Sequence, residues 1–264
     1  MISKSLRDHR RALIGWVIGL SAFLSMYVGV VYPSIVEDPA TYSAQAVAKY
    51  PGALKDLMGG LQDFATAPGY LQTVVYQILL PVLFIVCAMV LANRSLAGPE
   101  ESGTFELIVT LPIDRRRLVL QLFAAMALGL LAVAAVTLAV AWALARSVDM
   151  DVRFDRIMAA HIGVYLLALF FGTLTLAVGA ATGRKAVASA VLGVWAVLGY
   201  MVVTVGKNVD AVSWLKWVSP FHYYAEGRPL YEGLPVGDYL VLAGAVAVLA
   251  LTAVLSFDRR DVGV

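Results

Sequence analysis

The chain has 264 residues and a formal net charge of +2, and its composition is far from that of a soluble protein. Hydrophobic residues make up 61% of it, charged residues only 14%, and the mean hydropathy is +0.81. Ordinary soluble domains are roughly 45–50% apolar and about 25% charged. This composition excludes a soluble fold. The small excess of positive charge predicts no nucleic-acid partner, because membrane orientation accounts for much of it.

Apolar stretches without charge recur along the chain at lengths of about twenty residues, enough to cross roughly 30 Å of hydrocarbon as a helix. The alternating patterns typical of membrane strands are absent. We therefore predict an all-α integral membrane protein with one domain over residues 1–264. The expected spans are residues 12–32, 73–92, 118–145, 157–181, 186–206 and 239–257.

Lysine and arginine predict the orientation of these spans, because such residues concentrate in cytoplasmic connections. Twelve of the 20 lysines and arginines fall in the shorter set of connections, which includes both termini. Both termini are therefore predicted to be cytoplasmic. The twelve are Lys4, Arg7, Arg10, Arg11, Arg94, Arg115, Arg116, Arg117, Arg184, Lys185, Arg259 and Arg260.

The segment before the first span has apolar residues such as Ile2, Leu6 and Leu13 at helical spacing, with basic residues between them. This pattern predicts a helix lying in the headgroup region. A simple topology signal is the alternative. Within the second span, Pro81 is expected to kink the helix.

The connection between the second and third spans has the signals of a short exposed helix. Gly103 offers a turn before the helix, Thr104 a cap at its start and Pro112 a stop at its end. Within the helix, Phe105 and Ile108 lie on the same face. Such a helix suits a groove on a soluble partner. The alternative is a solvated loop whose arginines only set topology. Asp114 is expected to cap the third span.

Three motifs together resemble the ABC-2 type permeases. The first is Glu100-Glu101-Ser102-Gly103-Thr104-Phe105-Glu106-Leu107, followed by Leu111-Pro112-Ile113 and a basic cluster. Residues 50–71, with Tyr-Pro, Leu-Met-Gly-Gly and Gly-Tyr-Leu, are similar to the external segment of the permeases grouped with copper-enzyme maturation systems and antibiotic exporters. Residues 217–223 contain the Ser-Pro-Phe segment that such proteins carry before their last span.

The resemblance implies a six-span, type V exporter-like membrane domain with a coupling helix seated on a separate ATPase. It also implies two membrane halves, by default a homodimer, and two ATPase subunits. The turn at Arg184 and Lys185 would be a second, smaller ATPase contact. The coupling residues implied in the first connection are Glu100, Glu101, Gly103, Thr104, Phe105, Glu106 and Ile108.

The external stretch before the last span carries Trp214, Trp217, Pro220 and Phe221. Similar permeases fold this region back into the outer leaflet as short re-entrant helices. An ordinary aromatic belt at the membrane surface explains the composition equally well.

Several motifs are missing. No G-x-x-x-x-G-K-[ST] loop occurs, so we predict that the chain is not an enzyme and that ATP and Mg²⁺ bind only to the partner ATPase. No Asp, Glu, Lys or Arg lies near the middle of a span, which disfavours ion-coupled transport. We expect no metal site, because His161 has no further ligands nearby in the sequence.

These features favour a permease subunit in the bacterial cell membrane that exports a hydrophobic or amphipathic compound, such as a drug, antibiotic, lipid or peptide. The alternative function is maturation of an extracytoplasmic enzyme, or signalling, through a protein bound outside at residues 33–72. Polar residues within the spans that could line a path are Tyr27, Tyr76, Gln121, Thr137, Thr173, Thr175 and Tyr200.

Overall fold

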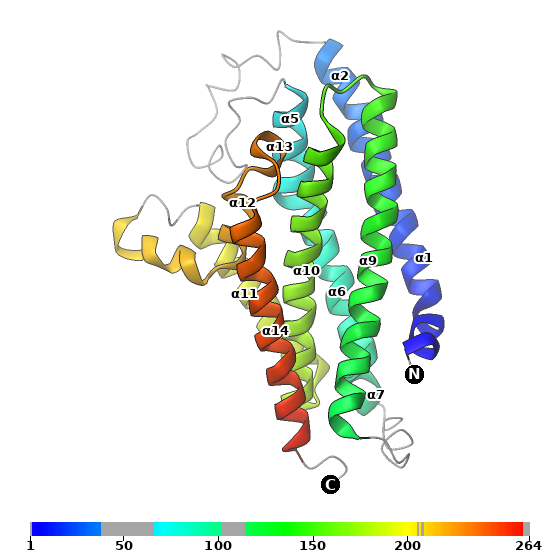
Figure 1. Cartoon of the computed structure of the whole chain (residues 1–264), viewed down its shortest axis with the longest axis vertical. Helices are drawn as coiled ribbons and strands as arrows, with labels where there is room; N and C mark the ends of the chain where they lie inside the picture. Colours follow the sequence, from blue (N-terminus) through cyan, green and yellow to red (C-terminus); the bar gives the residue numbers. More distant parts are fainter. Residues whose placement is uncertain (1, 38–65, 102–113, 205, 207–208, 261–264) are drawn as a thin grey trace.

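The computed structural model describes residues 2–37, 66–101, 114–204, 206 and 209–260. Over these residues every regular element is a helix, and the long helices stand side by side in one bundle (Figure 1). Six of the helical stretches are long and apolar enough to cross a membrane, and they coincide with the six predicted spans. They are Arg10–Glu37, Ala67–Ser95, Arg115–Ser147, Phe154–Thr182, Lys185–Thr204 and Val236–Asp258.

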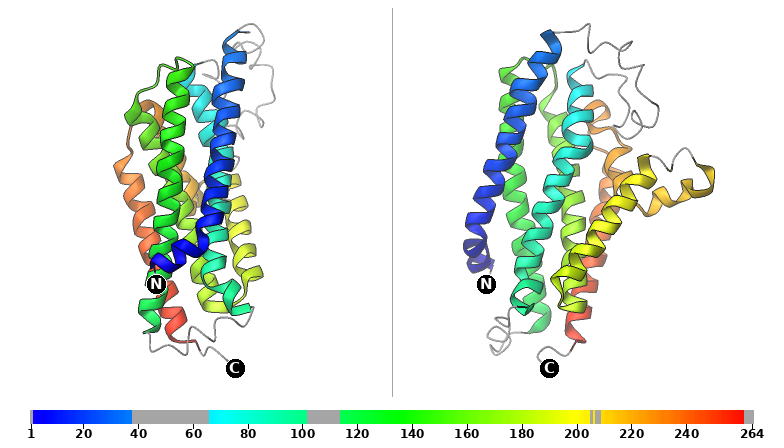
Figure 2. Two further views of the ribbon diagram at one scale, coloured as in Figure 1. Left: turned by 90° about the vertical axis from the view of Figure 1, so that its right-hand side faces the viewer. Right: turned by 180° about the vertical axis from the view of Figure 1, so that it is seen from behind.

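The first span combines α1 (Ile2–Met26), a π-helical segment η1 (Tyr27–Val31) and α2 (Tyr32–Glu37). Helix α1 continues without interruption from the segment predicted to lie in the headgroup region. Figure 2 (left) shows that its first turns run across the bundle before the helix turns upright. The predicted interfacial segment is thus the bent start of the first span.

The second span is built from α5 (Ala67–Tyr70), a longer π-helical segment η2 (Leu71–Leu79) and α6 (Leu80–Ser95). Proline has no N–H to donate to the preceding turn. Pro81 lies at the second position of α6, directly after η2. The irregularity that we expected at this proline therefore takes the form of a wider helix before it.

The other spans are α9 (Arg115–Ser147), α10 (Phe154–Thr182), α11 (Lys185–Thr204) and α14 (Val236–Asp258). The predicted cap of α9 is confirmed: the Asp114 side chain accepts a hydrogen bond of 2.9 Å from the N–H of Arg116. At 1.5 Å per residue, α9 is about 50 Å long and exceeds the hydrocarbon thickness. Helix α10 ends at Gly183, whose φ of 67° is readily adopted only by glycine.

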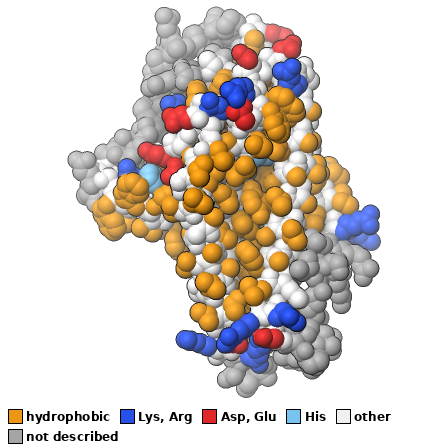
Figure 3. Space-filling model, viewed as in Figure 1, with side chains coloured by type: hydrophobic (Ala, Val, Ile, Leu, Met, Phe, Trp, Pro, Cys, Tyr) orange, Lys and Arg blue, Asp and Glu red, His pale blue; other side chains and the backbone are white. Residues whose placement is uncertain are grey.

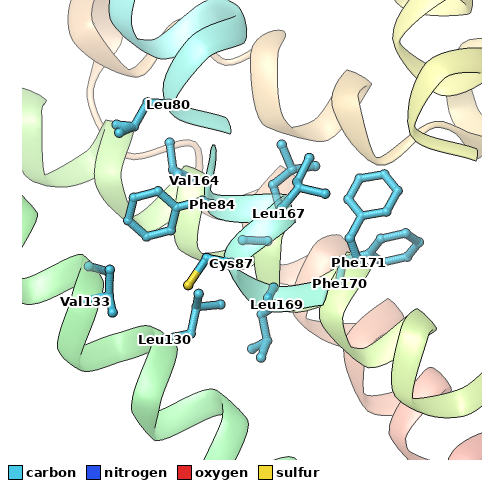
Figure 4. Close-up of a cluster of buried hydrophobic side chains, with 14 of the residues drawn as sticks. Leu80, Phe84, Cys87, Leu130, Val133, Val164, Leu167, Leu169, Phe170 and Phe171 are labelled. Atoms are coloured by element: carbon cyan, nitrogen blue, oxygen red, sulfur yellow. The ribbon is translucent and has the colours of Figure 1, made fainter. Parts of the chain in front are cut away.

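Helix α10 is the most buried of the spans and packs against α6, α9, α11 and α14. Figure 4 shows the centre of this packing, where Phe84 and Cys87 of α6 meet side chains of α9 and α10. Within a bilayer, close packing rather than escape from water holds such helices together. Figure 3 shows apolar side chains over the middle of the bundle and charged ones toward its ends.

Helix α1 begins and α14 ends at the same end of the bundle, which we call the terminal end (Figure 1). The opposite, distal end holds α2 and α5. Three short helices connect α11 to α14 along the side of the bundle. These are the 3₁₀-helix η4 (Asp210–Val218), α12 (Pro220–Ala225) and α13 (Pro229–Glu232). Helix α11 leans away from the bundle and η4 projects beyond it (Figure 2, right).

Candidate functional site

The predicted ATPase contacts meet at the terminal end. The first connection begins there with α7 (Ala97–Glu101), which contacts both α10 and α11. The Glu101 carboxylate accepts a hydrogen bond of 2.6 Å from the backbone N–H of Lys185, the first residue of α11. A carboxylate is favourable at this position because helix N-termini carry unpaired N–H groups and partial positive charge.

Of the predicted coupling residues, the structure describes Glu100, Glu101, Arg184 and Lys185, and it brings the two connections to which they belong into contact. Arg184 and Lys185 are exposed. The other coupling residues, Gly103, Thr104, Phe105, Glu106 and Ile108, lie outside the described residues, as does most of the external segment 33–72.

Arginines that follow the first connection tie α9 to the end of α14. Arg116 forms an ion pair of 2.8 Å with Asp258. Arg115 donates to the backbone oxygen of Arg260 at 2.8 Å. The Arg116 side chain is 61% exposed, so this ion pair adds little stability. Its contribution is to set the position of the start of α9.

The buried threonines among the predicted path residues are satisfied within their own helices. Thr137 donates to the backbone oxygen of Val133, Thr173 to that of Leu169, and Thr175 to that of Phe171. All three are fully enclosed by neighbouring side chains of the bundle. A hydroxyl with this back-bond needs no external partner. In a single copy of the chain, these threonines belong to the helix packing.

Tyr76 belongs to a buried polar cluster near the distal end. Its hydroxyl lies 2.6 Å from Nδ1 of His161, and its backbone oxygen accepts a hydrogen bond from the Tyr224 hydroxyl. The Tyr239 hydroxyl donates to the backbone oxygen of Ala159 at 3.0 Å. The cluster thus joins η2, α10, α12 and α14. Since unpaired polar groups are costly in a bilayer, these bonds determine how the four elements fit together.

The other three predicted path residues lie apart from one another. Tyr27 begins η1, and its backbone oxygen accepts a hydrogen bond of 2.6 Å from the Tyr70 hydroxyl. Gln121 is half-buried in the second turn of α9. Tyr200 is half-buried on α11, and its ring packs against Phe221. The seven predicted residues therefore do not line one common path in a single chain.

The segment before α14, which was predicted to be external, contains the short helices η4 and α12. Ser219 caps α12 by accepting the N–H of Phe221, and it donates to the backbone oxygen of Gly199 at 2.9 Å. The predicted residues divide into two environments: Trp214 and Trp217 are about 60% exposed on η4, whereas Pro220 and Phe221 are buried. The tryptophans face outward and the Pro-Phe pair anchors the segment to the bundle.

Apolar grooves lie on both sides of α11. One, of about 650 Å³, separates α11 from η4, and Ser219 is the only polar residue among those that line it. The other, of about 300 Å³, separates α11 from η2 and α6, and Gln77 and Tyr200 are its polar lining residues. Such grooves suit molecules that are mainly hydrophobic, because a few polar groups on an apolar wall fix orientation without excluding an apolar ligand.

Three structural contacts were not predicted from the sequence. His161 was considered as a metal ligand, and its pairing with Tyr76 spans 85 positions. Asn93 donates to Ser189 at 2.9 Å across 96 positions. Arg260 pairs with Glu100 across 160 positions. Each residue alone resembles many others of its kind, and no spacing pattern marks such distant partners.

Six membrane-competent helices, an apolar middle and charged ends define a multi-pass helical membrane protein. The sequence model of the ABC-2 family transporter proteins matches residues 1–262. The chain therefore belongs to this family, and it is a membrane permease subunit of an ABC transporter. A comparison with proteins of curated function finds no significant match.

Proposed function

We propose that the chain is one half of an exporter that moves a hydrophobic or amphipathic compound out of the cell. Two copies would pair with two ATPase subunits, each of which binds ATP and Mg²⁺. The apolar grooves beside α11 carry the proposal, since they are ligand-sized spaces whose walls match such a cargo. Helix α11 is among the least buried spans, so its exposed side remains available to a second copy.

The terminal end is proposed to face the cytoplasm of a bacterial cell, where the ATPase would dock. Exposed cationic residues at this end include Arg94, Arg117, Arg184, Lys185 and Arg259. This enrichment follows the bias that orients membrane proteins. The whole chain would then form a single membrane domain with both termini inside. ATP-driven closure of the ATPases would move the first connection, and the spans would follow.

The assembly can be tested directly. When the tagged chain is expressed with its neighbouring genes and extracted gently with nucleotide present, native mass spectrometry is expected to detect two permease chains with two ATPase subunits. This stoichiometry follows from the two-fold symmetry that most homo-oligomers adopt. A permease that carries no ATPase under these conditions would remove the proposal.

The groove between α6 and α11 gives a test of the transport path. Gly193 lines this groove, and an added Cβ would meet nothing within 4 Å. Gly193→Phe is therefore expected to fold and to fill the groove. The added ring would occupy space that a cargo needs, and a loss of about 1.4 kcal/mol in cargo binding is a factor of ten. ATP-driven uptake of amphipathic fluorescent dyes into inside-out vesicles should therefore fall about tenfold.

The matched control is Gly244→Phe on the exposed side of α14, where an added Cβ also meets nothing within 4 Å. This variant should transport at the wild-type rate. Equal dye transport by the two variants would show that the groove is not part of the path.

A further inference from the structure

At the terminal end, the segment that follows the last span reaches across to the first connection. The Arg260 guanidinium, two residues beyond the end of α14, forms an ion pair with the Glu100 carboxylate of α7. Both side chains are largely enclosed, with exposed fractions of 24% and 15%. An enclosed pair is screened less by solvent than a surface pair, so loss of one partner leaves a poorly solvated charge.

The same guanidinium also contacts the end of α10. Its Nη1 lies 3.1 Å from the backbone oxygen of Ala180 and 3.5 Å from that of Gly179. The Gly179 oxygen also accepts the N–H of Gly183 at 2.8 Å, and a cation beside the last carbonyl groups of a helix is favourable. Arg260 therefore binds two elements at once. It contacts α7 through the Glu100 carboxylate and α10 through the carbonyl groups at the end of that helix.

Gly183 provides the space for this arrangement. A Cβ at this position would lie 2.2 Å from Nη2 of Arg260 and 2.7 Å from the Glu100 carboxylate. The guanidinium and the carboxylate thus meet directly against the backbone of the turn between α10 and α11. After this turn, at the start of α11, the Glu101 carboxylate accepts a hydrogen bond from the backbone N–H of Lys185.

We propose that Arg260 is a positioning residue of the coupling apparatus, which fixes the start of the first connection to the end of α10. This inference rests on the proposed function, in which the ATPase moves that connection. With Arg260 in place, a displacement of α7 carries α10 and the end of α14 with it. Since α10 packs against four other spans, this contact passes the movement to the bundle.

The experiment measures movement at the distal end in the assembled complex. A spin label is placed at the exposed Asp151, just before α10, through Asp151→Cys in a Cys87→Ala background. Electron paramagnetic resonance then gives the distance between the labels of the two permease copies, without nucleotide and with ATP and vanadate. The reference complex is expected to shift between two distance populations.

Arg260→Gln should leave the ATPase bound, as native mass spectrometry can verify, and should greatly weaken this shift. Glu100→Gln breaks the same ion pair from the other side and should weaken the shift in those complexes that retain the ATPase. The population ratio should change by about 5- to 150-fold, which is the range typical of coupling between two sites. Arg260→Lys keeps the charge and should recover part of the shift. The control is Arg259→Gln, which removes a neighbouring exposed charge and should leave the shift unchanged.

A full nucleotide-dependent shift in Arg260→Gln would overturn the inference while leaving the proposed function intact. If that variant does not fold, a full shift in Glu100→Gln has the same meaning. A reference complex that binds no ATPase, or that shows no shift with nucleotide, would overturn the proposed function and the inference with it.

Discussion

Replacing Phe105 and Ile108 together with aspartate is expected to leave the six spans inserted and to separate the permease from its ATPase. The two residues share one face of the helix predicted in the first connection. Apolar anchors at the centre of an interface commonly contribute 2 kcal/mol or more, and each 1.4 kcal/mol is a factor of ten in affinity. Binding of the ATPase should weaken at least about thirtyfold, measured by titrating the ATPase onto the permease in lipid nanodiscs.

Thr110→Asp is the control, because position 110 falls on the opposite face of the same predicted helix. This substitution adds one negative charge, where the double variant adds two, without removing an anchor, and it should leave binding within about twofold of wild type. Unchanged assembly and unchanged stimulation of ATP hydrolysis in the double variant would show that the ATPase docks elsewhere.

A single methyl group at Gly163 is expected to destabilise the distal end. An added Cβ would lie 2.3 Å from the Tyr239 hydroxyl oxygen and 3.2 Å from the ring of Tyr224. Tyr239 must move, and its hydroxyl then loses its hydrogen bond to the backbone oxygen of Ala159. Overpacking costs roughly 1–3 kcal/mol, and the lost bond about 1 kcal/mol more. The free energy of unfolding in mixed micelles should fall by about that sum in Gly163→Ala.

Two further variants make this test specific. Gly244→Ala adds the same methyl group where nothing lies within 4 Å, and it should be neutral or slightly stabilising. Tyr239→Phe removes the atom nearest to the new methyl group, so it should recover part of the loss when combined with Gly163→Ala. Additive effects of these two substitutions would contradict the packing in the structure.

Much of the fold could be predicted because the bilayer imposes simple requirements. A span needs about twenty apolar residues whose backbone groups are all paired, and the sequence displays such stretches directly. Local signals were also sufficient where a side chain acts on its own helix, as with the cap at Asp114. The sequence did not reveal that the helix before Pro81 widens, since a proline is compatible with several kinds of irregularity.

The site was harder to predict because its contacts join residues that are far apart in the sequence. The sequence implied two separate ATPase contacts, yet Glu101 and Lys185 touch, and Arg260 fastens Glu100 to the same turn. The polar residues predicted for a path differ in their surroundings: Thr173 and Thr175 are bonded to their own helix, whereas Tyr200 lies in a groove wall. The identity of a residue does not indicate which neighbour will form a hydrogen bond with its side chain.

The π-helical segments η1 and η2 are points at which one part of the first or second span can rotate relative to the rest. A π segment holds more residues per turn than an α-helix, and here Tyr70 and Tyr224 each donate a hydroxyl to a backbone oxygen within one of them. Each residue of an α-helix turns it by about 100°. If the tyrosine hydroxyl left the backbone oxygen and the π-helical segment took up regular α-helical hydrogen bonding, the turn would hold one residue fewer. The rest of that span would then rotate by this angle. A different face of the helix would then point toward its neighbours.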